Sequence, residues 1–135
     1  MRIVSAVVAA LLLFSGVANA TPSRGVTGKI LAQWTAGDRD YVLREITIDA
    51  GGSTGWHHHD GTLYAVVKQG VLTRTESDCT TNFVNRRGDT LIEQPHQVHI
   101  GRNLGTEPMV LDVLYVNPVG APLSRDEANP GCSFE

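Results

Sequence analysis

Residues 51–64 read Gly51-Gly52-Ser53-Thr54-Gly55-Trp56-His57-His58-His59-Asp60-Gly61-Thr62-Leu63-Tyr64. Three of the five histidines in the chain are consecutive here. In an extended strand, residues i and i+2 share a face, so His57 and His59 point together while His58 points away. Two imidazoles on one face, beside a glycine-bearing turn, form part of a metal site. A further donor is available in Pro95-His96-Gln97-Val98-His99. Imidazole suits zinc, iron, copper and nickel, so the ligand type leaves the metal open.

The rest of the chain has the pattern of an all-β protein. Short runs rich in β-branched residues, separated by turns containing glycine, asparagine or aspartate, predict strands. The predicted strands cover residues 26–34, 41–48, 63–67, 71–75, 90–94, 98–103 and 109–116, with a turn at 49–52 that closes the second of them. The run 63–67 is almost continuously apolar, which predicts that both of its faces are covered. About eight short strands at this spacing predict a sandwich or barrel, with both histidine segments beginning strands at one open end.

These segments resemble the two sequence motifs of the cupin superfamily. The matching positions are Gly51, His57, His59 and Gly70 in the first motif, and Gly88, His99 and Asn103 in the second. The departures are Leu63, where the family usually has glutamate, Pro95, where the motif's proline is shifted by one residue, and His96, where glycine is usual. The resemblance covers about residues 40–117, most of the chain that follows the N-terminal segment.

The resemblance implies a single-domain, double-sheet jelly-roll β-barrel with a divalent transition metal (iron, manganese, zinc or nickel) in its mouth. His57, His59 and His99 would be the ligands. Leu63 has no donor atom, so we expect a site without an acidic ligand. Glu93 is an alternative source of a carboxylate, but the sequence does not fix the phase of its strand. An all-imidazole site keeps the full charge of the ion and several open positions, which suits anionic chelating substrates.

We expect different roles for the two other histidines. His58 faces away from the site, so we expect it to be a surface or packing residue. We expect His96 to lie on the turn beside Pro95, with entry into the metal site as the alternative.

Residues 1–20 have the pattern of a cleavable signal peptide. Arg2 precedes an apolar run, and Ala18-x-Ala20 predicts cleavage before Thr21. The alternative is a membrane anchor, for which the run is short. The predicted location is therefore secreted or periplasmic. In an exported chain, Cys79 and Cys132 predict a disulfide that closes 53 positions and stabilises the fold by roughly 4 kcal/mol. The alternative is that the thiols are soft metal ligands.

The expected organisation places a signal peptide at 1–20, an N-terminal arm and first strand at 21–39, the barrel core at 40–117 and a C-terminal tail at 118–135. The tail, tethered by the disulfide, is expected to hold no regular structure beyond one short helical turn. Without the signal, 10 basic and 14 acidic residues remain. This mild acidity, without a basic stripe, argues against nucleic acid and against a membrane surface as partners. The expected partner is a small-molecule ligand or substrate, and pairing of edge strands leaves a homodimer open.

Two functions fit these features. One is a metal-dependent enzyme of the dioxygenase or isomerase/lyase type acting on a small oxygen-bearing substrate, although the sequence identifies no general base. The other is a non-catalytic module that binds a small ligand or metal outside the cell. A jelly roll that keeps its histidines without a metal is a third interpretation.

Overall fold

The computed structural model describes residues 19–135, which are built from β-strands and connecting turns without a helix. The strands are β1 (Arg24–Ala36), β2 (Arg39–His58), β3 (Thr62–Gln69), β4 (Val71–Glu76), β5 (Asn82–Arg86), β6 (Thr90–Glu93), β7 (His99–Arg102), β8 (Met109–Pro118) and β9 (Arg125–Asp126). The predicted signal peptide lies outside the described residues, apart from its last two positions. Because residues 19–135 contain no helix, none of them is in a helix able to cross a membrane.

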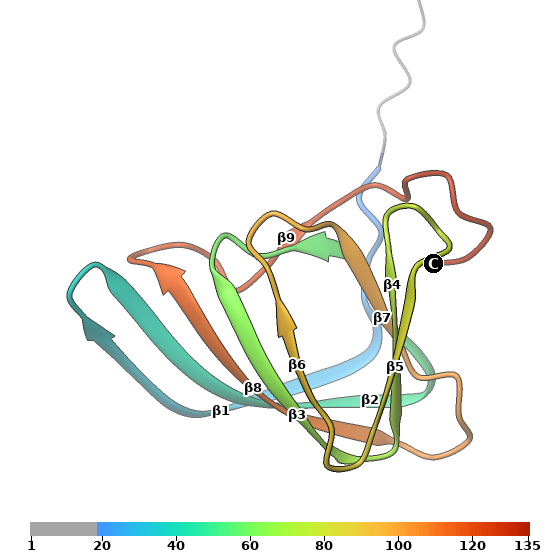
Figure 1. Cartoon of the computed structure of the whole chain (residues 1–135), viewed down its shortest axis with the longest axis horizontal. Helices are drawn as coiled ribbons and strands as arrows, with labels where there is room; N and C mark the ends of the chain where they lie inside the picture. Colours follow the sequence, from blue (N-terminus) through green and yellow to red (C-terminus); the bar gives the residue numbers. More distant parts are fainter. Residues whose placement is uncertain (1–18) are drawn as a thin grey trace, which may run out of the picture.

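The strands form one antiparallel sheet in the order β5-β4-β7-β2-β8-β3-β6, with β1 and β9 both pairing with β2. Figure 1 shows this sheet curled into a nearly closed barrel, with β3 and β8 on one wall and β4, β5 and β7 on the other. The predicted all-β jelly-roll barrel is therefore confirmed. The curl brings the ends of β2, β6 and β7 to one rim, where the histidines lie.

β2 is longer than the sequence predicted. The expected turn at 49–52 is wrong: the strand continues to His58, and Gly51 and Gly55, with φ of 75° and 70°, bend it instead of ending it. Its first half pairs with β1 and β8, and its second half pairs with β7 and β9. β2 thus crosses from one wall of the barrel to the other. His57 lies at the end of β2, not at a strand beginning, and pairs in register with His99 at the start of β7.

The core lies on the inner face of β3 and β8, where buried residues alternate with less buried ones. Its members include Ile48, Leu63, Val67, Leu72, Met109, Leu111 and Val113. Each such side chain contributes about 1.5–3 kcal/mol of burial free energy. The prediction that both faces of residues 63–67 are covered is wrong, since Tyr64 is 46% exposed. The strand instead has one buried face, which lines the barrel.

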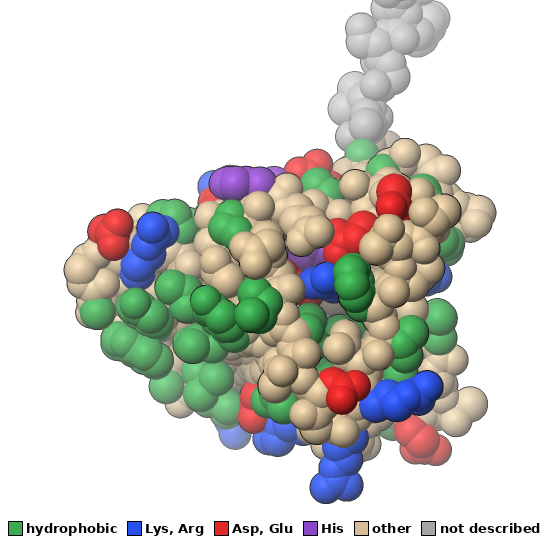
Figure 2. Space-filling model, viewed as in Figure 1, with side chains coloured by type: hydrophobic (Ala, Val, Ile, Leu, Met, Phe, Trp, Pro, Cys, Tyr) green, Lys and Arg blue, Asp and Glu red, His purple; other side chains and the backbone are tan. Residues whose placement is uncertain are grey.

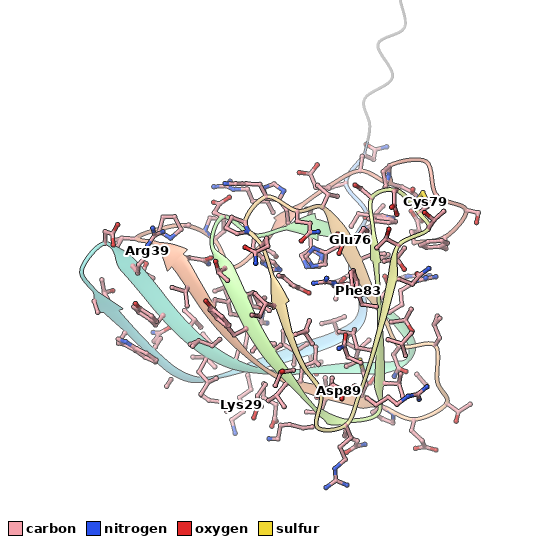
Figure 3. All side chains as sticks on the ribbon, in the orientation of Figure 1. Lys29, Arg39, Glu76, Cys79, Phe83 and Asp89 are labelled. Carbon is pink, nitrogen blue, oxygen red and sulfur yellow. A yellow bond between two sulfur atoms is a disulfide. The ribbon has the colours of Figure 1, made fainter. Side chains whose placement is uncertain are left out.

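The C-terminal tail is attached to the barrel at two places. Cys79 and Cys132 form the predicted disulfide, whose sulfur is visible beside the Cys79 label in Figure 3. β9 pairs with His57 and His58, so the tail contains a short strand and not the expected helical turn. Sequence patterns miss this strand because only two residues pair.

The segment expected to be an N-terminal arm is also packed against this region. Thr21 is buried, its backbone N–H donates to the Glu127 carbonyl (2.9 Å), and its hydroxyl accepts from the Trp56 N–H (2.7 Å). The two ends of the described chain therefore meet beside the last residues of β2.

Candidate metal centre

The inner cluster consists of His57, His59, Glu93 and His99. A ligand atom from each side chain lies within 4.8 Å of all the others. The four residues come from the end of β2 and the turn after it, from the last residue of β6 and from the first residue of β7. All four are buried, with 1–8% of their surface exposed. The structure thus brings together the three histidines that the sequence singled out.

Backbone carbonyls fix which nitrogen of each imidazole faces the cluster. The Nδ1–H groups donate to the carbonyls of Gly55 (from His57, 2.9 Å), Leu123 (from His59, 2.7 Å) and Gln97 (from His99, 2.8 Å). A nitrogen that faces a carbonyl carries the proton, so Nε2 of each neutral ring keeps its lone pair. This arrangement presets the tautomer and the orientation that metal-binding histidines need.

Glu93 supplies a carboxylate that the sequence analysis did not place. Its Oε2 lies 3.2 Å from His59 Nε2 and 3.1 Å from His99 Nε2. Glu93 is the direct cross-strand partner of Leu63 in the β3–β6 pair. Cβ atoms of such partners lie only about 4.5–5.5 Å apart, so a carboxylate on β6 reaches the space that one at position 63 would occupy. The structure therefore places in the site the carboxylate alternative that the sequence left open, and knowledge of the β3–β6 register would have shown it.

Arg74 holds Glu93 from the side opposite the histidines. Its guanidinium lies 3.6 Å from Glu93 Oε1 and 3.1 Å from Glu76 Oε1, and also over the Phe83 ring at 4.6 Å. Glu76 and Phe83 are labelled near the rim in Figure 3. Because Arg74 binds one oxygen of Glu93, the other oxygen is left to face the imidazoles.

The charges of the inner cluster are strongly coupled. Burial first, and then the neighbouring His99 and His59, lower the pKa of His57 from 6.5 to about 3. Burial also opposes protonation of His99, but the Glu93 charge and hydrogen bond outweigh it and raise the pKa of His99. Burial acts to raise the pKa of Glu93, yet the charge of His99 and the contact with His59 hold that pKa well below 4.5. Without a metal, the charge of Glu93 therefore favours the protonated form of His99, whereas burial favours the neutral form of His57.

These residues fit a divalent transition ion. His59 Nε2 is fully buried and makes no hydrogen bond, although Glu93 Oε2 is near. Three imidazoles and one carboxylate are donors that zinc, iron, manganese and nickel all accept. Nε2 of His57, His59 and His99 and the carboxylate of Glu93 would hold such an ion, with His99 bound as the neutral imidazole that a metal ligand requires. The cluster can therefore hold a metal, whose identity the donors leave open.

A cavity of about 220 Å³ opens beside the inner cluster. Its wall is mostly apolar and includes Leu63, Ala65, Leu91, Leu111 and Val113, together with Arg44, Tyr115 and Asp126. Figure 2 shows a hollow in this face in which histidine, acidic and basic side chains meet. At about 30 Å³ per water, the cavity holds about seven waters, so it suits a small molecule. The sequence did not reveal Arg44, Tyr115 or Asp126 as lining residues, because they come from strands that meet only in the fold.

The two other histidines lie outside the inner cluster. His58 points away from it, as the strand alternation predicted, and its Nδ1 lies 2.7 Å from Glu127 Oε1. His96 is exposed on the turn before β7 and does not enter the inner cluster.

Comparison with known proteins supports the fold. The cupin domain family matches residues 44–116, more than half of the chain. No curated protein matches significantly. Among solved structures, the polyketide cyclase RemF from Streptomyces resistomycificus has a TM-score of 0.65 at 20% identity, covering 82% of this chain and 79% of its own. A cupin-like protein from Thermotoga maritima has a TM-score of 0.64 at 18% identity, covering 77% of each chain. KdgF from Halomonas sp. has a TM-score of 0.57 at 20% identity, covering 70% of this chain and 82% of its own. At these identities the structures show a shared fold, and together with the family match they establish that the chain belongs to the cupin family.

Proposed function

We propose that the protein is an exported metal-dependent cupin enzyme. In this proposal His57, His59, His99 and Glu93 bind a divalent transition ion, and the substrate is a small anionic molecule with oxygen donors. The observation that carries the proposal is the set of three buried imidazoles, each with Nδ1 bonded to a carbonyl and Nε2 turned toward one carboxylate. When bound, the ion supplies Lewis acidity to a coordinated oxygen.

Arg44 is the residue that favours an anionic substrate. It lines the cavity, and no carboxylate among residues 19–135 lies within 4.0 Å of its guanidinium. Gly28 makes room for it, because a Cβ there would overlap the guanidinium. A guanidinium without a carboxylate partner favours a carboxylate or similar group, which it binds through charge-assisted hydrogen bonds. Arg44 would therefore bind the acidic group of the substrate.

Tyr115 lies between Arg44 and the inner cluster. Its ring packs edge-on against His59, with 5.6 Å between ring centroids. Burial raises the pKa of Tyr115, with the neighbouring Arg44 acting in the opposite direction. The phenol is therefore neutral at physiological pH and can donate its proton in a hydrogen bond to a substrate oxygen.

Asp126 is the candidate general base. It is an exposed residue of β9 that lines the cavity and pairs in register with His57. Glu93 is engaged by Arg74 and the histidines, whereas Asp126 is free to accept a proton at the mouth. An Asp126→Asn variant should keep its metal and lose turnover by about 100-fold or more, the scale of general-base catalysis.

Metal analysis of the purified protein is the direct test of the inner cluster. We expect His57→Ala and His99→Ala each to hold one tightly bound ion fewer than the wild type at the same free-metal concentration, because loss of one buried ligand exceeds the roughly 10–100-fold loss seen for supporting residues. Glu107→Ala, which removes an exposed carboxylate outside the inner cluster and the cavity wall, serves as the control and should keep the ion. Equal metal content in all four proteins would refute the ligand assignment.

A non-catalytic binding module is the second candidate. The solvent exposure of Asp126, in contrast to the buried cluster, favours it. The two candidates differ in turnover. Protein loaded anaerobically with ferrous iron, or with manganese, nickel or zinc, is mixed with small hydroxy and keto acids, and oxygen uptake and product formation are followed. Substrate binding that Arg44→Gln weakens, without turnover for any metal, would favour the module.

Export is supported by the disulfide, which persists in oxidising compartments. If the signal is cleaved where the sequence predicts, N-terminal sequencing of the exported protein gives Thr21. A chain that retains residues 1–20 would refute cleavage.

A further inference from the structure

Two histidines remain outside the proposed centre, and they lie together. His58, Asp60 and His96 form an outer cluster, in which a ligand atom from each residue lies within 4.8 Å of the others. The ring centroids of His58 and His96 are 5.8 Å apart. The outer cluster lies on the face of residues 57–59 opposite the inner cluster. All five histidines of the chain are therefore divided between two clusters on the two faces of one short segment.

Glu127 orients His58 in the way that a metal-binding histidine is oriented. Its Oε1 lies 2.7 Å from His58 Nδ1, and its backbone N–H donates to the Trp56 carbonyl at 2.8 Å, which holds Glu127 beside the end of β2. Nε2 of the same ring lies 3.7 Å from Asp60 Oδ1, too long for a hydrogen bond and open enough to admit an ion between them. A carboxylate on one ring nitrogen that leaves the other free is a recurring arrangement around bound metals.

His96 occupies a backbone position that favours glycine. Its φ is 63°, in the left-handed region, and its N–H donates to the His59 carbonyl at 2.8 Å. A residue with a Cβ costs roughly 1–2 kcal/mol there relative to the right-handed conformation. The hydrogen bond needs only the backbone, so the turn itself does not require an imidazole. What the imidazole adds is a second nitrogen donor facing His58.

The Asp60 carboxylate can still coordinate an ion although Arg125 binds it. Arg125 Nε lies 2.9 Å from both carboxylate oxygens, and its terminal nitrogen lies 2.8 Å from Oδ2. A carboxylate has about four lone-pair sites, so the lone pairs of Oδ1 on the side of His58 are available to an ion. Arg125 also offsets the negative charge of Asp60, which would weaken the ion's binding.

We propose that His58, Asp60 and His96 form a second metal site, open to solvent and independent of the inner cluster, that binds a divalent transition ion such as Zn²⁺. Two imidazoles and one carboxylate, with remaining positions filled by water, are a common donor set for zinc and ferrous iron. The site is weaker than the inner one, because it has three donors and is partly exposed. It does not rest on the proposed function of the barrel.

The test counts Zn²⁺ in proteins that lack one site or the other. Proteins are dialysed against Zn²⁺ buffered in the low micromolar range, and bound zinc is measured by elemental analysis. We expect two ions per chain in the wild type, one in Glu93→Gln/His99→Ala, one in His96→Gly and none in the triple variant. Zinc in His96→Gly equal to that in wild type would overturn the outer site. The zinc content of Glu93→Gln/His99→Ala tests the inner site, and that of His96→Gly tests the outer site. Each proposal can therefore be refuted without refuting the other.

His96→Gly is chosen because loss of zinc from this variant would not result from misfolding. Glycine adopts a φ of 63° without strain, so this variant should be at least as stable as the wild type when both are metal-free. Added Zn²⁺ should raise the melting temperature of Glu93→Gln/His99→Ala and leave that of the triple variant unchanged. An equal rise in both would place the ion elsewhere and overturn the proposal.

Two further variants separate an ion site from a hydrogen-bonded surface cluster. Glu127→Ala should weaken outer-site zinc by about 10–100-fold, the scale for a residue that orients a ligand, whereas Glu107→Ala should leave it unchanged. Arg125→Gln should tighten zinc, because it removes the positive charge beside Asp60. A weaker zinc affinity in Arg125→Gln would contradict the assignment of Asp60 as a ligand.

Discussion

At the scale of single residues, the carboxylate of the inner cluster comes from the strand beside the expected one. Leu63 and Glu93 face each other across the β3–β6 pair. The account predicts that the two can be exchanged. Glu93→Leu should lose the metal, and Leu63→Glu combined with Glu93→Leu should regain much of it, because the new carboxylate reaches the same space. Metal content and affinity of the three proteins check this prediction.

The control for the exchange is Leu63→Glu alone, which places two carboxylates at one site. Like charges at short range disfavour each other, so this variant should be less stable than the double variant when metal-free. A double variant that binds no more metal than Glu93→Leu would contradict the exchange.

The lowered pKa of His57 makes the stability of the metal-free protein depend on pH. Its pKa is lowered from 6.5 to about 3 by burial and by the other imidazoles. Below pH 6.5, His57 becomes protonated in the unfolded chain but stays neutral in the folded protein. This residue's share of the free energy of unfolding therefore falls as the pH decreases from 6.5 toward 3. His57→Gln should remove that share and reduce the loss between pH 7 and pH 4.

Denaturant unfolding of chelator-treated proteins at several pH values measures this effect. The free energy of unfolding should depend less steeply on pH in His57→Gln than in the wild type. If glutamine packs worse than histidine, the two proteins should also differ more in stability at pH 7 than at pH 4. Parallel curves for the two proteins would show that His57 titrates normally in the folded state.

At the scale of elements, the sequence predicted the existence of most strands and misjudged the ends of some. The apolar, β-branched run at 109–116 predicted β8, one face of which is buried along its whole length. Residues 49–52 looked like a turn because they contain Gly51 and Gly52, but pairing with β7 carries β2 past them. Such pairing depends on residues distant along the chain. The same limit hid Glu93, whose residue type was visible but whose strand phase was not.

Gly55 is the bend on which the position of His57 depends. Its φ is 70°, its carbonyl accepts from His57 Nδ1, and a Cβ there would collide with the Thr21 carbonyl. Gly55→Ala should therefore cost more than the roughly 1–2 kcal/mol of a left-handed alanine alone, and should weaken metal binding.

Gly37 is the matched control for that bend. It has a φ of 61° and open space where a Cβ would be, so Gly37→Ala should cost only the backbone penalty and should not affect the metal. Denaturant unfolding and metal affinity measured on both variants check the comparison. Equal costs and unchanged metal affinity would show that the contact between Gly55 and Thr21 does not matter.

At the scale of the whole molecule, the C-terminal tail completes the site. It carries the Leu123 carbonyl that orients His59, the Asp126 that lines the cavity and the Glu127 that orients His58. The disulfide fixes the end of this tail to the loop after β4. Cys79→Ala/Cys132→Ala should lose roughly 4 kcal/mol of stability by the loop-entropy relation.

Loss of the disulfide should also weaken metal binding by the inner cluster. Because the tail supplies the partner of His59 Nδ1, the cysteine variant should bind the inner ion about 10–100-fold more weakly while still folded. Hydrogen exchange should show faster exchange in residues 118–135 than in β8. Unchanged metal affinity with a faster-exchanging tail would show that the tail does not support the inner cluster.

The central claim is that three imidazoles and one carboxylate, distant along the chain, bind one ion inside the barrel mouth. X-ray absorption spectroscopy of zinc-loaded His96→Gly, which retains only the inner cluster, tests it most directly. The account predicts three imidazoles and at least one oxygen at about 2.0–2.2 Å from the zinc, and loss of this bound zinc when His99→Ala is added. A zinc environment with fewer than three imidazoles in His96→Gly, or one that His99→Ala leaves unchanged, would contradict it.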